Sequence, residues 1–171
     1  IVDEAFGIQR GLMSTIHAVT NDQRILDMQH SDLRRARAAC WNIIPTTTGA
    51  AKAIGLVYPK AKGKMDGLAI RVPVMDVSMV DLVVDLEKTP TIQTINEAFR
   101  KAAEGSLKGI VQYIDEELVS SDFIGNTHSC IFDSLSTFVV GNMAKLMAWY
   151  DNEAGYAHRL ADLVAMMAKT L

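Results

Sequence analysis

The chain has 171 residues, and its 17 Lys and Arg nearly balance its 20 Asp and Glu, which leaves a formal net charge of −3. Hydrophobic residues make up 49% of it and charged residues 22%, a composition that excludes an intrinsically disordered chain. This slightly negative charge does not favour binding to nucleic acid or to an anionic membrane surface. No apolar run in the sequence is long enough for a membrane-spanning helix. A compact chain of this length exposes roughly 8,300 Å² when folded, so we expect residues 1–171 to form one domain.

The first half of the chain predicts a strand, a long irregular segment and a short helix. Residues 1–8 are typical of the end of a helix, so we expect the chain to be part of a longer protein. The alternating run over 12–16 predicts a strand that leads into His17. Residues 20–45 match neither the helix nor the strand period, and such segments in compact domains are usually functional. A short helix is expected over 50–58, between a glycine and a proline.

The second half has stronger periodicity. Alternating apolar residues predict strands over 68–72 and 80–86. Helical spacing predicts a helix over 92–104, which a following glycine can close. Two strands flank a Gly-Asn turn over 138–150, the pattern of a hairpin. The last helix is expected from Tyr156 to the end, with an apolar stripe of Leu160, Leu163, Val164, Met167 and Leu171.

These elements favour an α+β fold. The βαβα rhythm of a parallel doubly wound sheet is absent, and several strands follow one another directly. We therefore expect a mostly antiparallel mixed sheet with helices on one face. In the predicted strand over 80–86, one side carries the apolar residues Val80, Leu82, Val84 and Leu86, while Val83 makes the other side partly apolar. Such a sheet is expected to pack against helices on one side and against a second copy on the other.

The cysteines and histidines exclude several kinds of site. Cys40 and Cys130 are too few for a disulfide framework, and no signal peptide is visible, so we expect a cytoplasmic protein whose thiols are buried or at an interface. Neither cysteine has the neighbours of a nucleophile. The four histidines and two cysteines lack metal-ligand spacing, so no metal is expected. No glycine-rich dinucleotide fingerprint and no P-loop is present.

Four positions could carry chemistry, and each has an ordinary alternative. His17, at a strand end, could act as a base or could be a structural histidine. Thr46–Gly49 precedes a helix, so its hydroxyls and free N–H groups could bind an anion, or Thr48 could simply cap the helix. Arg71 could hold the same anion or be a solvated strand arginine. Asn152 could recognise another amide or only form a turn before Gly155.

Six segments of this sequence, in this order, carry a family resemblance. They are 17–23 (HAVTNDQ), 32–39 (DLRRARAA), 42–52 (NIIPTTTGAAK), 71–73 (RVP), 119–123 (VSSDF) and 149–153 (WYDNE). Together they resemble the C-terminal, catalytic half of phosphorylating glyceraldehyde-3-phosphate dehydrogenase, over nearly the whole chain. The resemblance implies glycolytic oxidation of glyceraldehyde 3-phosphate, with inorganic phosphate and NAD, to 1,3-bisphosphoglycerate and NADH through a cysteine thioester. It also implies a homotetramer.

The resemblance also assigns roles to residues of this chain. His17 matches the histidine that pairs with the thiolate, and Thr20 and Arg71 match the site of the substrate's phosphate. Thr48 and Gly49 match the site of the attacking phosphate. Arg35, or in its place Arg34, lies near that second site in the family pattern. In the same pattern Asn152, with Tyr156 close by, holds the nicotinamide carboxamide, and 20–41 resemble the S-loop that reaches the cofactor and a neighbouring subunit.

Departures from the family leave alternatives. The family's nucleophilic cysteine and its dinucleotide-binding domain both lie upstream of the residues present here, so this chain alone is expected to be inactive. Gln29 stands where NAD-using members commonly have proline, which leaves NADP open. One alternative is a relative of erythrose-4-phosphate dehydrogenase, a group that usually alters the Thr-Thr-Thr-Gly segment. Another is a non-catalytic domain of the same fold that only oligomerises.

Overall fold

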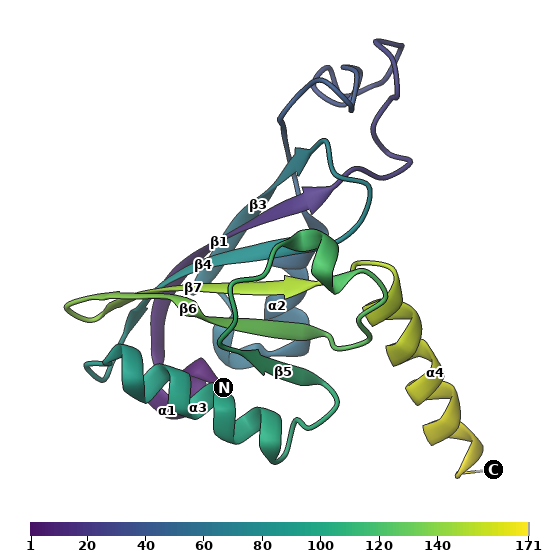
Figure 1. Ribbon diagram of the computed structural model, residues 1–171. Coiled ribbons are helices and arrows are strands. Elements are labelled where there is room, and N and C mark those ends of the chain that lie inside the picture. Colours follow the sequence, from purple (N-terminus) through teal and green to yellow (C-terminus); the bar gives the residue numbers. More distant parts are fainter. Residues whose placement is uncertain (171) are drawn as a thin grey trace.

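The computed structural model describes residues 1–170, and the side chains of all of these except residues 51 and 52. Figure 1 shows a twisted sheet with helices at its lower edge and a long excursion above it. The helices are α1 (Val2–Phe6), α2 (Gly49–Val57), α3 (Ile92–Glu104) and α4 (Ala154–Ala168), with 3₁₀ turns η1 (Pro59–Ala61) and η2 (Ser120–Phe123). The strands are β1 (Ile8–Ala18), β2 (Ile44–Thr46), β3 (Met65–Val72), β4 (Ser78–Leu86), β5 (Val111–Ile114), β6 (Cys130–Val140) and β7 (Met143–Tyr150).

The described strands form one seven-stranded sheet in the order β2-β3-β1-β4-β7-β6-β5. Four of its neighbouring pairs are antiparallel, and the pairs β1–β3 and β5–β6 are parallel. The β6–β7 hairpin turns at Gly141, whose φ of 59° suits a residue without a side chain. The prediction of an α+β fold with a mostly antiparallel mixed sheet is confirmed.

The main core lies where α1 and α3 cover one face of the sheet. Helix α3 begins at Thr91, whose hydroxyl accepts from the backbone N–H of Thr94. Its Ile95 is fully buried, and Phe99 stacks on Phe132 of β6 with ring centroids 3.7 Å apart. Burial of each such side chain stabilises the fold by about 1.5–3 kcal/mol. This packing fixes the sheet from which the site residues project.

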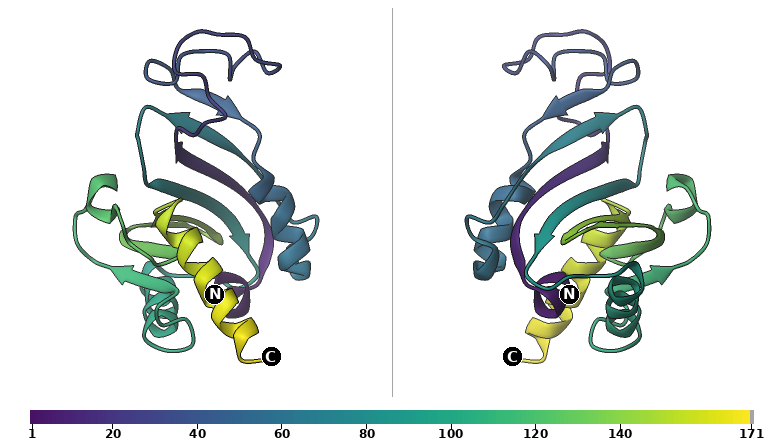
Figure 2. Two further views of the ribbon diagram at one scale, coloured as in Figure 1. Left: turned by 90° about the vertical axis from the view of Figure 1, so that its right-hand side faces the viewer. Right: turned by 90° about the vertical axis from the view of Figure 1, so that its left-hand side faces the viewer.

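Several elements differ from the sequence prediction. Strands β2 and β5 were not predicted, because three or four residues are too few for a period to emerge. Helix α4 begins two residues before Tyr156, and its predicted stripe is exposed, with side chains 45–65% accessible from Leu160 to Met167. Figure 1 shows α4 extending away from the sheet, and in the left view of Figure 2 it crosses in front of the sheet. Leu171, the last residue of that stripe, lies outside the described residues.

The far face of the sheet also carries exposed apolar side chains. Leu12, Leu68 and Met143 are 66%, 43% and 42% accessible, whereas Val84 and Leu86, on the helix-covered face, are fully buried. The chain exposes 10584 Å² in total, more than a quarter above the roughly 8,300 Å² expected of a compact chain of this size. The exposed apolar side chains contribute to this excess, and they mark surface that the chain does not cover by itself.

Candidate functional site

The site lies at one end of the sheet, where strands from distant parts of the sequence finish together. His17, the penultimate residue of β1, lies opposite Arg71 in the parallel β1–β3 register. Arg71 is in turn opposite Ile44 of β2. On the other side of β1, Ser78 at the start of β4 lies opposite Tyr150 at the end of β7. The pairing of the strands, and not closeness in sequence, therefore brings these side chains together.

His17 is half-buried and held by its own strand. Its Nδ1 lies 2.7 Å from the carbonyl oxygen of Ala18 and 2.9 Å from Nη1 of Arg71. The Ala18 carbonyl can only accept and the Arg71 guanidinium can only donate, so the first contact favours a proton on Nδ1 and the second favours a lone pair there. Burial lowers the pKa of His17, and the positive charge of Arg71 lowers it further. The ring is thus a neutral base near physiological pH.

Arg71 and Thr20 form the first polar cluster beside His17. Nη1 of Arg71 donates to the carbonyl oxygen of Ala18 at 2.9 Å and to the Thr20 hydroxyl at 3.4 Å. Thr20 is held in turn by Gln23, whose Oε1 accepts from the Thr20 backbone N–H at 2.9 Å and from its hydroxyl at 3.3 Å. Arg71 is half-buried, and its Nε has no acceptor among the described residues. The alternative of a solvated arginine is therefore wrong.

Thr48 and Gly49 form a second, more open cluster at the start of α2. The Thr48 hydroxyl accepts from the backbone N–H of Ala50 at 3.1 Å, which confirms that Thr48 caps the helix. A side-chain carbon added at Gly49 would meet no atom within 4 Å. This glycine is thus not required by packing within the described chain, and open space lies in front of the helix start. Anion binding there stays a prediction.

Arg35 ties the irregular segment to β2. Its Nε donates to the Thr46 hydroxyl at 2.7 Å, its Nη2 donates to the Thr47 hydroxyl at 3.3 Å, and its Nη1 pairs with Asp22 at 2.9 Å. Arg34, by contrast, is exposed. Arg35 is therefore the arginine that contacts the threonine segment, although its donors already have partners in the chain.

Asn152 lies in a cavity of about 360 Å³ at the same end of the sheet. The neighbouring Asp151 is 2% exposed and accepts from the backbone N–H groups of Gly125, Glu153 and Ala154 at 2.8–2.9 Å. Burial alone would raise the pKa of Asp151, but these three donors outweigh it and lower the pKa. The cavity is lined by His17, Ser129, Tyr150, Asp151, Asn152, Gly155, Tyr156 and Arg159.

The cavity around Asn152 suits a flat ligand that carries an amide. Oδ1 of Asn152 accepts from the Ser78 hydroxyl at 2.8 Å, and no described residue accepts from its Nδ2. Tyr156, at the rim, is 67% exposed and offers an aromatic surface. The His17 ring is in the same wall, with Tyr150 edge-on to it at a centroid distance of 6.0 Å. A nicotinamide ring fits these donors and surfaces.

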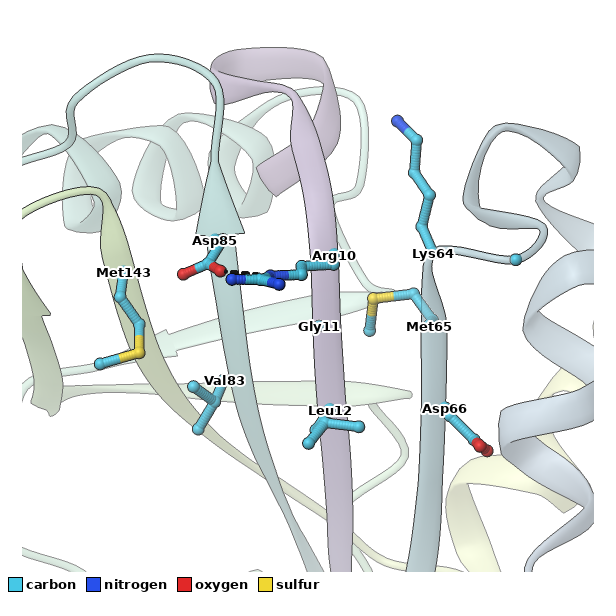
Figure 3. Close-up of a pocket in the computed structure, with 10 residues that line it drawn as sticks. Arg10, Gly11, Leu12, Lys64, Met65, Asp66, Val83, Asp85 and Met143 are labelled. Atoms are coloured by element: carbon cyan, nitrogen blue, oxygen red, sulfur yellow. Dashed lines mark hydrogen bonds and ion pairs between the residues drawn. The ribbon is translucent and has the colours of Figure 1, made fainter.

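A larger hollow of about 660 Å³ lies elsewhere, at the opposite end of β1. Figure 3 shows Arg10 reaching from β1 to Asp85 on β4, with Leu12 and Val83 below this pair. The two charged groups are 2.7 Å apart. None of the predicted site residues lines this hollow, and its described lining contains no histidine and no cysteine. Its volume therefore does not make it the site.

The cysteines differ from each other in environment. Both are free thiols. Burial raises the pKa of Cys130 to about 11, which keeps it protonated and unreactive at neutral pH. Cys40 is exposed in this chain, so of the two expected states, buried or at an interface, only an interface position fits it. Neither lines the cavity that contains His17.

Residues 1–170 contain neither a candidate metal site nor a candidate membrane-spanning helix. No group of three or more His, Cys, Asp or Glu among these residues could hold a metal ion. None of the described helices has the length and apolar character needed to cross a membrane.

Three residues at the site were not singled out from the sequence: Gln23, Ser78 and Asp151. Gln23 and Asp151 belong to segments that carry the resemblance, and an Asp followed by Asn and Gly had signalled only a turn. Ser78 had no signal, because its contacts come from β1 and from the loop after β7, 60 and 74 residues away in sequence. Only the fold brings these segments together.

The fold and the site together define a class of protein. It is an α+β domain in which a histidine, an arginine with a hydroxyl partner and a carboxamide lie at one end of a mixed sheet, with an open helix start after the edge strand β2. The family is identified by comparison. The family model described as "Glyceraldehyde 3-phosphate dehydrogenase, C-terminal domain" matches residues 1–152, so the chain belongs to that family.

Curated relatives agree with this assignment. Glyceraldehyde-3-phosphate dehydrogenase of Geobacillus stearothermophilus is 58% identical over 169 residues, which cover 98% of this chain and 50% of that protein. The protein of the same name from Mycobacterium avium is 57% identical over 171 residues, 100% of this chain and 50% of its own length. Glyceraldehyde-3-phosphate dehydrogenase 1 of Bacillus cereus is 58% identical over 168 residues, with coverage of 98% and 50%. The chain spans about half the length of these relatives.

Proposed function

We propose that this chain is the catalytic half of a phosphorylating glyceraldehyde-3-phosphate dehydrogenase. The reaction converts glyceraldehyde 3-phosphate, inorganic phosphate and NAD⁺ to 1,3-bisphosphoglycerate, NADH and a proton. The aldehyde carbon is oxidised while bound to a cysteine, and a phosphate oxygen then displaces the thiolate. The cysteine is expected on a segment outside this chain. The observation that carries the proposal is the cluster of His17, Arg71 and Thr20, in a chain 58% identical to an enzyme of that name.

His17 is proposed to move the proton. In the tautomer that donates from Nδ1 to the Ala18 carbonyl, Nε2 has a free lone pair and can accept a proton from a thiol or from the hydroxyl of a hemithioacetal. The low pKa of the ring keeps it neutral beforehand. Positioned acid–base catalysis of this kind contributes about 10²–10⁴-fold to a rate.

Two anion sites are proposed, one for each phosphate group of the product. Arg71 and Thr20 suit the phosphate that the substrate already carries, because a half-buried guanidinium forms charge-assisted hydrogen bonds. Thr48 and Gly49, with Arg35 nearby, suit inorganic phosphate, because the open helix start offers N–H groups and a positive dipole end. The intact threonine segment favours a phosphate-using enzyme over the erythrose-4-phosphate alternative.

Asn152 and Tyr156 are proposed to hold the nicotinamide ring, with most of the cofactor bound by the other half of the protein. When bound, the cofactor supplies the oxidant for the aldehyde carbon. We propose NAD as the cofactor. NADP stays an alternative, because Gln29 stands where NAD-using members of the family commonly have proline. The two free thiols are consistent with the reducing cytoplasm as the location.

Self-association is proposed for this chain, and a homotetramer for the full-length enzyme. The exposed apolar side chains on the far face of the sheet and the excess exposed area support it. Light scattering on the chain at high concentration is expected to give a mass above that of a monomer. A monomer at all concentrations would contradict this part of the proposal.

One experiment tests the proposed activity. The protein that joins this chain to its dinucleotide-binding half is expected to form NADH only when both glyceraldehyde 3-phosphate and inorganic phosphate are present. The isolated chain is expected to form none, because His17 has no thiol to act on. NADH formation that does not depend on phosphate would contradict phosphorylating chemistry, and no oxidation at all would favour the non-catalytic alternative.

A further inference from the structure

We propose that Ser78 is a positioning residue that decides which end of the Asn152 carboxamide faces the cofactor. The inference rests on the proposed function, since it concerns the ligand of the Asn152 cavity. It adds a residue outside the six segments on which the family resemblance rests. Ser78 is 1% exposed and lies at the start of β4, in contact with both the end of β1 and the loop after β7.

The hydrogen bonds of Ser78 form a short directed chain. The backbone N–H of Ala18 donates to the Ser78 hydroxyl oxygen at 3.1 Å. An N–H group cannot accept, so the hydroxyl proton remains available to a different partner. The oxygen Oδ1 of Asn152 lies 2.8 Å from the Ser78 hydroxyl and accepts that proton. The direction of the chain runs from Ala18 through Ser78 to Asn152.

This direction fixes the amide of Asn152. If the amide were flipped, its Nδ2 donors would face a hydroxyl that already accepts from Ala18, and the hydroxyl proton would lose its acceptor. Leaving such a buried donor unpaired is unfavourable. The flipped state is thus disfavoured, and Nδ2 faces the cavity as a donor. The Nδ2 donor matches a carbonyl oxygen on the ligand, and a ligand that places an N–H group at the same point binds less well.

A second observation indicates that the position of Ser78 is imposed by the fold. The preceding residue, Val77, has a φ of 67°, a left-handed conformation that is strongly disfavoured for a β-branched side chain. Val77 is 3% exposed and packs with Ile114, Phe123 and Ile131, and its backbone N–H donates to Asp76 at 2.7 Å. A buried side chain and a tight hydrogen bond hold the strained residue, and Ser78 begins β4 from that point.

The experiment compares cofactor binding by the full-length enzyme and by its Ser78→Ala variant. Three probes are used: NAD⁺, 3-acetylpyridine adenine dinucleotide, which keeps the carbonyl but lacks the amide N–H, and an analogue without any group at that ring position. We expect the unmodified enzyme to bind the first two within about threefold and the third about 3- to 10-fold more weakly. In Ser78→Ala the first two weaken by about 3- to 10-fold, while the third is unchanged.

Ser134→Ala is the matched control. Ser134 is also buried, and its hydroxyl donates to the carbonyl oxygen of Ile114 at 2.7 Å, away from the cavity. This variant is expected to lose a similar amount of thermal stability without changing the ratio of affinities for the three probes. Ser78→Thr, which keeps the hydroxyl, is expected to keep the unmodified ratio.

The outcomes separate this inference from the proposed function. An unmodified enzyme that binds no NAD⁺ overturns the proposed function and this inference with it. Equal weakening of all three probes in Ser78→Ala, or no weakening, overturns the inference alone. If Ser78→Ala does not fold, the unmodified enzyme still decides the matter: affinity for the acetylpyridine probe about tenfold or more below that for NAD⁺ means that Asn152 presents its oxygen, and the inference is wrong.

Discussion

The two proposed anion sites are built in opposite ways. Arg71 on β3 and Thr20, two residues after the end of β1, are half-buried, and their positions are fixed by sheet register and by contacts with Ala18 and Gln23. Thr48 and Gly49 stand at an open helix start. The strands hold the donors of the first site in place, whereas the donors of the second site face open space. The difference suggests that the second site is completed by groups outside the described residues.

The two sites also differ in charge. The first contains a guanidinium with an Nε that has no acceptor among residues 1–170. At the second, Arg35 already pairs with Asp22 at 2.9 Å, so much of its charge is neutralised locally. Variants that affect one site and spare the other can therefore break or sharpen this comparison.

The largest effect is expected from the base that adjoins the first site. In the full-length enzyme, His17→Asn should lower kcat by about 10²–10⁴-fold, because it removes the proton acceptor. The KM values for both substrates should change by less than about threefold, since neither anion site loses a donor. Steady-state NADH formation measures this. A KM effect without a kcat effect would show that His17 binds substrate and does not move a proton.

Arg71→Met should have the next largest effect. Loss of a charge-assisted hydrogen bond costs about 1.5–3 kcal/mol, or about 10- to 150-fold in kcat/KM for glyceraldehyde 3-phosphate. The KM for inorganic phosphate should stay within about threefold if the two sites are separate. Arg71→Lys is the control, because it keeps the charge and loses the fork, and it should recover part of the effect. Equal losses for both substrates would contradict the separation of the sites.

Thr48→Val should act on the second site and more weakly. Removal of one neutral hydroxyl is expected to raise the KM for inorganic phosphate by about 3- to 10-fold. It should also destabilise α2 by about 0.5–2 kcal/mol, because the cap to Ala50 is lost. Thr48→Ser keeps both functions and is the matched control. An unchanged KM for phosphate, with α2 still folded, would leave Thr48 as a helix cap only.

The sequence predicted the helices and strands better than it predicted the contacts between them. Local periodicity indicated α3 and the β6–β7 hairpin, because these depend on neighbouring residues. His17 and Arg71 were each candidates, but their contact follows from the parallel pairing of β1 with β3, which no local pattern specifies. The resemblance placed them in one site, and the register gives the physical reason.

Helices α3 and α4 repeat this lesson. Both have an apolar stripe in the sequence, yet α3 buries Ile95 and Phe99, whereas α4 leaves Leu160 and Leu163 about half exposed. A stripe predicts a helix and an apolar contact, but it does not say whether the partner belongs to the same described chain. Ser78 is the extreme case, since a serine at the start of a strand has no signal of its own in the sequence.

The smallest expected effect is electrostatic and links the first site to its base. Burial, and then the charge of Arg71, lower the pKa of His17 from its ordinary value of 6.5. Below pH 6.5 the unfolded chain therefore takes up a proton that folded His17 resists, so the free energy of unfolding should fall as pH drops from 6.5 through the lowered pKa. Arg71→Met removes the second cause and should raise the pKa of His17, leaving the larger effect of burial. Urea unfolding of this chain between about pH 7.5 and 5 checks the slope, which His17→Asn should flatten. A slope that is the same with and without His17 would mean that other groups set the acid sensitivity.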